Sequence, residues 1–156
     1  MSIKGLDTIL KEHDFFRGMS PAHLELIAGC GSNVVYQGGD HLCQQGDAAD
    51  HFFILREGMV SIELEMPHGE VLAIQTVDAG SVLGWSWLFE PYRWSFDVRA
   101  VEPVRAIALD GRCLRGKLGD DPVLAADLMK RFCAIMTDRL EATRLQLVDM
   151  YSPPVR

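Results

Sequence analysis

The stretch His51-Phe-Phe-Ile-Leu-Arg-Glu-Gly-Met-Val-Ser-Ile-Glu-Leu-Glu65 decides the fold of this 156-residue chain. It holds two short apolar runs on either side of Glu57-Gly58, a dipeptide typical of a turn. In the second run Val60, Ile62 and Leu64 alternate with polar residues, so the apolar side chains share one face of a strand. The stretch therefore predicts two consecutive β-strands.

Runs of the same kind lie on both sides of this stretch, between Asn33 and Leu109. Turn signals separate them at Gly38-Gly39-Asp40, Gly46-Asp47 and Pro67-His68-Gly69. We expect strands over residues 34–36, 52–55, 59–66, 71–77 and 104–109. Strands at such regular intervals are typical of a roll or barrel.

Helical patterns flank the strand region. Leu6, Ile9 and Leu10 recur at helical spacing, and Ser20-Pro21 is a capping residue followed by a first-turn proline. The second helix should end near residues 29–31.

The same start signals return after the strands. Asp110 can cap a short helix that contains Cys113, Leu114 and Leu118, and Asp121-Pro122 opens a helix that runs to about Met150, roughly 40 Å long. The chain is therefore expected to be a single α+β domain over residues 1–156. It has N-terminal helices (1–31), an antiparallel β-roll of the jelly-roll type (33–109) and C-terminal helices (110–150).

The last helix carries an apolar stripe along most of its length. A helix that extends past a compact roll should not leave such a stripe in water. We expect a homodimer in which the same helix of a second chain covers it. The stripe comprises Leu124, Leu128, Phe132, Ile135, Met136 and Leu140, and continues to Leu147.

Composition excludes several classes of function. Lys and Arg number 15 against 22 Asp and Glu, a net charge of −7, which disfavours nucleic acid and membrane surfaces as partners. No signal peptide or long apolar segment is evident, so a cytoplasmic location is expected. The sequence has no Walker loop, G-x-S-x-G or H-E-x-x-H motif, and we expect no enzyme.

The cysteines and histidines predict no metal centre. Cys30, Cys43, Cys113 and Cys133 are far apart and lack the spacing of metal ligands, and we expect four reduced thiols rather than a disulfide. The histidines are scattered, with no pair in a metal-binding pattern.

Four blocks of this sequence resemble one family. They are Tyr36-Gln-Gly-Gly-Asp-His-Leu-Cys-Gln-Gln-Gly-Asp47, the segment from His51 to Ile62, Ala79-Gly-Ser-Val-Leu-Gly84, and Phe96-Asp-Val-Arg-Ala100. In this order they are similar to the cyclic-nucleotide-binding domain of the catabolite activator and FNR family, over about residues 8–150. The resemblance implies a phosphate-binding cassette whose backbone amides hold the phosphate of cyclic AMP or cyclic GMP.

The cassette, residues 84–95, departs from the family pattern. It opens with Gly84-Trp85-Ser86-Trp87-Leu88, where Trp85 stands in place of the glutamate that binds ribose. Aligned without a gap, Trp94 takes the place of the arginine that pairs with phosphate. Ser95 is kept, and Arg93 lies one residue early. Val71, Ile74 and Val82 are expected to line the interior of the roll, as core residues first and as contacts of a ligand in the pocket second.

Three interpretations of this cassette stay open at the level of sequence. The tryptophans fill the pocket, or they stack on a different flat ligand whose anionic group Arg93 holds. In the third, a one-residue shift turns Arg93 inward and cyclic nucleotide still binds.

Two functions follow from these interpretations. The chain is a sensor that binds a small ligand in the roll and signals through its last helix, or a ligand-free dimeric docking protein for a protein partner. Transcription factors of the family carry a helix-turn-helix domain after this helix. Here only Tyr151-Ser-Pro-Pro-Val-Arg156 follows, so a stand-alone domain is expected.

Overall fold

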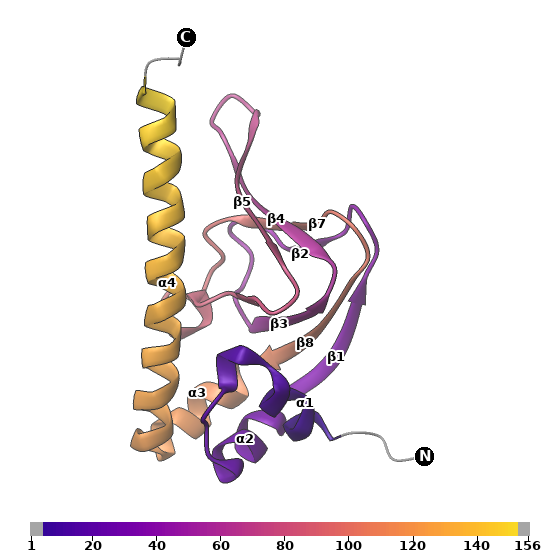
Figure 1. The fold of residues 1–156 in the computed structure, drawn as a ribbon, viewed down its shortest axis with the longest axis vertical. Helices are drawn as coiled ribbons and strands as arrows, with labels where there is room; N and C mark the ends of the chain where they lie inside the picture. Colours follow the sequence, from indigo (N-terminus) through magenta and orange to yellow (C-terminus); the bar gives the residue numbers. More distant parts are fainter. Residues whose placement is uncertain (1–4, 153–156) are drawn as a thin grey trace.

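The computed structural model describes residues 5–152 as a β-roll with helices gathered at one end and a long helix along one side (Figure 1). The helices are α1 (Leu6–Glu12), α2 (Pro21–Ala28), α3 (Gly111–Asp120) and α4 (Pro122–Tyr151), with the short 3-10 helices η1 (Asp14–Phe16) and η2 (Ser86–Leu88). The strands are β1 (Gly31–Tyr36), β2 (His41–Cys43), β3 (His51–Glu57), β4 (Met59–Glu65), β5 (Val71–Asp78), β6 (Val82–Leu83), β7 (Asp97–Ala100) and β8 (Val104–Asp110). The expected α+β architecture is confirmed.

The strands form two antiparallel sheets of four strands each, in the orders β1-β8-β3-β6 and β2-β7-β4-β5. All five expected strands are present. Three further strands, β2, β6 and β7, have only two to four residues each. Strands this short cannot show an alternation of apolar and polar residues in the sequence. They are recognised as strands only because they pair with longer neighbours.

Strand β3 shows why the deciding stretch is apolar at consecutive positions. Phe53 and Leu55 face the space between the two sheets, whereas Phe52 and Ile54 face the helices. Because both faces of β3 are covered, neither set of side chains alternates with polar residues. The molecule therefore has two apolar cores, which β3 separates.

Polar side chains begin the helices where the sequence predicts. Ser20 Oγ accepts a hydrogen bond from the His23 amide. Asp110 accepts from the amides of Arg112 and Cys113, at 2.9 and 3.0 Å. Asp121 accepts from the Leu124 amide at 3.0 Å. Each bond satisfies a free amide in the first turn of a helix.

The apolar stripe of α4 divides into two parts, which corrects the expected dimer surface. Leu124, Leu128 and Phe132 are at most 1% exposed and pack in the chain's own core, so a second chain cannot reach them. Ile135 is partly buried against the same core. Beyond it Met136, Arg139 and Ala142 are still partly buried, and the fully exposed apolar side chains are Leu140, Leu145, Leu147, Val148, Met150 and Tyr151.

Two of the four cysteines are bonded, so the expectation of four reduced thiols is wrong for them. Cys30, between α2 and β1, forms a disulfide with Cys113 on α3. The Asp110 amide donates to the Cys30 carbonyl at 2.8 Å and brings the start of α3 beside the end of α2. Cys43 and Cys133 are free thiols.

Glu63 on β4 is only 7% exposed, although it lies on the polar face of that strand. Arg99 on β7 donates Nε to Oε1 at 3.2 Å and Nη2 to Oε2 at 3.0 Å. These bonds, aided by a weaker one from Ser61, lower the pKa of Glu63 against the opposing effect of burial. The pair links two neighbouring strands on the outer surface of the roll.

Candidate functional site

The cassette lies between β6 and β7 and contains η2. Trp87 of η2 is fully buried in the helix-facing core, where its ring stacks on Phe52 at 5.1 Å between centroids. Its indole nitrogen donates to the Gly84 carbonyl at 3.2 Å. Leu88 packs against the same core. Both residues hold η2 in place and do not face the interior of the roll.

Trp94 occupies the interior of the roll beside Gly84. Its side chain is 5% exposed and stacks on Phe53 at 6.4 Å between ring centroids. Gly84 has φ +98°, and a Cβ there would lie 2.5 Å from Cη2 of Trp94. The glycine is required on both counts, since only glycine adopts this backbone freely and leaves room for the indole.

Trp85 lies between the roll and α4. Its ring centroid is 6.3 Å from that of Phe96, and the Arg139 guanidinium lies over the indole, 5.0 Å from the ring centroid. Trp85 thus packs at the edge of the helix-facing core that holds Trp87, and Phe96 lies between it and Trp94 in the roll.

The polar cassette residues do not converge on a common point. Arg93 is exposed, and its Nη1 donates to the Gly46 carbonyl at 2.8 Å. Ser95 is exposed, and Ser86 begins η2, partly exposed. Arg93 pairs with Ala48 in an isolated β-bridge outside the named strands, and its side chain is exposed whereas that of the next residue, Trp94, is buried, as expected for neighbouring residues of extended backbone.

The expected pocket lining is corrected at two of its three positions. Val71 is 54% exposed, because it lies at the start of β5 beyond the body of the roll. Val82 packs in the helix-facing core, and its neighbour Leu83 faces the roll interior instead. Ile74 packs against the roll interior, and its contact with a ligand stays a prediction.

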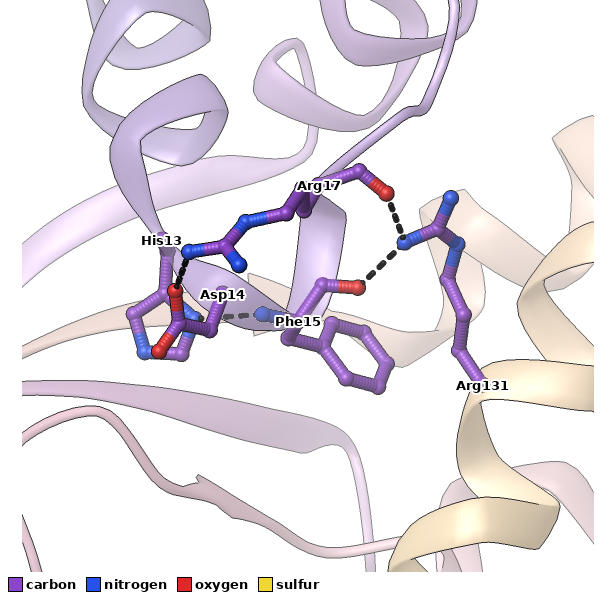
Figure 2. Close-up of polar contacts among 5 residues, drawn as sticks. All are labelled: His13, Asp14, Phe15, Arg17 and Arg131. Atoms are coloured by element: carbon purple, nitrogen blue, oxygen red, sulfur yellow. Dashed lines mark hydrogen bonds and ion pairs between the residues drawn. The ribbon is translucent and has the colours of Figure 1, made fainter.

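A cavity open to solvent lies outside the cassette. It has a volume of about 480 Å³ and lies between η1, α4, β5 and the turn before β6. Figure 2 shows one wall, where the Nη1 of Arg131 reaches the carbonyls of Phe15 and Arg17, at 2.6 and 2.9 Å. Arg131 Nε also donates to Asp127 at 2.9 Å. Arg131 therefore fastens η1 to α4.

Arg139, a residue that the sequence interpretation missed, also lines this cavity. Its Nη2 donates to the Val82 carbonyl, and its Nη1 is buried with no partner among residues 5–152. Burial lowers the pKa of Arg139 to about 10, so the side chain is still charged at neutral pH. One feature of the sequence could have identified Arg139 as a residue of this cavity. Arg131, Ile135 and Arg139 follow one another at intervals of four residues and therefore lie on one face of α4.

Over residues 5–152, no helix is long and apolar enough to cross a membrane. In that same range, no cluster of His, Cys, Asp and Glu side chains has an arrangement that could hold a metal ion.

Comparison with known proteins agrees with the fold. The chain is 23% identical over 145 residues to the CRP-like cAMP-activated global transcriptional regulator of Mycobacterium tuberculosis (strain CDC 1551 / Oshkosh), covering 93% of this chain and 63% of that protein. The chain thus spans less than two thirds of this relative.

Two solved structures share the architecture. A cyclic nucleotide-binding domain from Methylobacillus flagellatus KT superposes with a TM-score of 0.78 at 17% identity, over 97% of this chain and 85% of that one. The sensor domain of the transcriptional regulator DNR from Pseudomonas aeruginosa gives a TM-score of 0.70 at 20% identity, over 86% and 91%. The family model of the cyclic nucleotide-binding domain matches residues 33–121, from β1 to the start of α4. This chain belongs to the cyclic nucleotide-binding domain family.

Proposed function

We propose that this chain is a non-enzymatic regulatory module whose cassette is closed to cyclic nucleotides by its own tryptophans and which acts as a dimer through the far half of α4. The contact between Trp94 and Gly84 is the observation that carries the proposal. The resemblance implies that backbone amides of the cassette hold the ligand phosphate. Here the Trp94 indole lies directly against Gly84, where the cassette begins, and stacks on Phe53 inside the roll.

Charge supports the same conclusion. A buried phosphate needs a cation or a set of donors, and removal of an ion-paired partner commonly costs about 3 kcal/mol or more. Trp94 supplies no charge, and the Arg93 guanidinium is held at the surface by Gly46. Cyclic AMP or cyclic GMP would therefore enter a filled pocket without a counter-charge.

The exposed half of α4 supports the dimer. Met136, Leu140, Thr143, Leu147 and Met150 follow at alternating intervals of four and three residues, the spacing of a coiled-coil seam. Leu140, Leu147 and Met150 are 52%, 50% and 71% exposed in the single chain. Pairing with the same helix of a second copy would bury this seam.

Ligand binding to the wild-type chain tests the closed cassette. We expect no heat of binding and no thermal shift with cyclic AMP or cyclic GMP at about millimolar concentration. The double substitution Trp85→Glu with Trp94→Arg restores both family residues and should bring binding back if it folds. Tight binding of either nucleotide by the wild-type chain would overturn the closed cassette.

Sedimentation tests the dimer separately. Leu140→Glu with Leu147→Glu places charges in the seam and should give monomers at concentrations where the wild-type chain is dimeric. Leu145→Glu is the matched control, since Leu145 is 61% exposed but lies off the seam. A wild-type chain that sediments as a monomer at high concentration would contradict the pairing.

A further inference from the structure

The cavity between η1 and α4 has the size of a ligand site. Its volume of about 480 Å³ lies in the range of known small-molecule pockets, about 300–1,000 Å³. No residue of the cassette, 84–95, lines it. The cavity is therefore a separate space from the cassette, although the Arg139 guanidinium on its wall lies over Trp85 of the cassette.

Arg139 brings an uncompensated charge to the wall of this cavity. Its guanidinium has one carbonyl and one indole face as neighbours, and no carboxylate lies within ion-pair distance of it among the described residues. A buried cation with an unsatisfied donor is unfavourable unless an anion pairs with it. Arg131, by contrast, is already satisfied by Asp127 and two carbonyls.

The other charged side chains that line the cavity indicate how much negative charge a bound ligand can carry. Arg131 and Arg139 contribute two positive charges, and Asp14 and Asp138 contribute two negative ones. Asp14 is exposed and paired with Arg17 (Figure 2), and Asp138 is also exposed. A multiply charged phosphate would meet these carboxylates, whereas a single carboxylate needs only Arg139.

The rest of the cavity is lined by apolar side chains, which favours a ligand whose uncharged part is apolar. Phe15, Val77, Ala134 and Ile135 line the cavity from three different elements. We propose that this cavity binds a small organic monocarboxylate with an apolar body, whose carboxylate pairs with Arg139 and whose body lies against these four side chains. The ligand would then bridge α4 to η1 and to the roll, and its presence would fix the angle of the helix.

Octanoate is a suitable probe, with 1-octanol as the uncharged analogue of the same chain length. Calorimetric titration of the full chain should show saturable binding of octanoate and binding of octanol at least about tenfold weaker. Arg139→Gln should weaken octanoate binding by about tenfold or more, because it removes the charge. Arg139→Lys should retain part of the affinity.

Arg144→Gln is the matched control, because Arg144 is an exposed arginine on the same helix. It should bind octanoate as the wild type does. Without ligand, Arg139→Gln should melt at the wild-type temperature or above it, since the substitution removes an unpaired buried charge. The melting temperature therefore shows whether weaker octanoate binding by Arg139→Gln comes from loss of the binding site or from loss of the folded structure.

The proposal fails if octanoate does not saturate at about millimolar concentration. Equal binding of octanoate and octanol, or unchanged affinity in Arg139→Gln, would also overturn it. None of these results bears on cyclic nucleotide binding or on the pairing of α4, which separate experiments test.

Discussion

Reduction of the Cys30–Cys113 disulfide should cost this domain a large share of its stability. The two cysteines are 83 residues apart in sequence. A cross-link that closes a loop of this length removes about 15 cal/mol/K of chain entropy from the unfolded state, or about 4.6 kcal/mol at 25 °C. A typical domain is stable by only about 5–15 kcal/mol, so the loss would be conspicuous.

Equilibrium unfolding in urea measures this loss. The oxidised chain should lose about 4 kcal/mol of unfolding free energy when dithiothreitol is added, and its melting temperature should fall by about 10 °C or more. Cys30→Ser with Cys113→Ser should show the same loss and no response to the reductant. Cys133→Ser is the control, because Cys133 is a free, exposed thiol.

A count of free thiols tests whether the Cys30–Cys113 disulfide is present. The unfolded, unreduced chain should titrate two free thiols, those of Cys43 and Cys133. Four free thiols in protein purified under air, together with an unfolding free energy that dithiothreitol leaves unchanged, would refute the bond and the magnitude derived from it.

Three further predictions concern the cap of α3, a buried histidine and the cassette glycine. Asp110→Ala should lower the free energy of unfolding in urea by about 1–2 kcal/mol, since two first-turn amides of α3 lose their acceptor, whereas Asp110→Asn should lose less. Burial lowers the pKa of His13 below 6.5, so stability should be full above about pH 6.5 and decline below it. The slope should be at most about 1.4 kcal/mol per pH unit, and pH-dependent melts of His13→Gln should lack this decline. Gly84→Ala should destabilise the chain by more than about 1 kcal/mol in the same urea assay, and Trp94→Leu in the same chain should recover part of the loss by removing the clash.

Patterns within a few neighbouring residues were sufficient to predict where the main helices begin and where the longer strands lie. The Ser20, Asp110 and Asp121 caps are each set by contacts within three residues, and all three begin helices in the structure. Strands β3 and β4 follow from their apolar runs for the same reason. Short strands such as β6 lack this information, because only their partners define them.

The site depends on long-range packing that the sequence does not encode locally. Trp87 and Trp94 look equivalent in the sequence, yet the turn of η2 sends one to the helix-facing core and the other into the roll. Arg139 resembles any helical arginine until the docking of α4 buries it against Val82. The Cys30–Cys113 pair likewise forms only when α2 and α3 meet.

α4 is held by the rest of the domain along much of its length. Asp121 caps the helix and contacts His23 of α2 at 3.1 Å, and Arg131 bonds two carbonyls beside η1. Farther along, Arg139 and Gln146 bond the carbonyls of Val82 and Ile74 in the roll. The 30 residues of α4 span about 45 Å, so a tilt of about 5° at Asp121 would move the far end by about 4 Å, close to the contact distance between packed carbon atoms, about 3.5–4.0 Å. Because η1, β5 and β6 carry these contacts, such a tilt would have to move them together with the helix, and a shift of any one of them would reach the exposed end of α4.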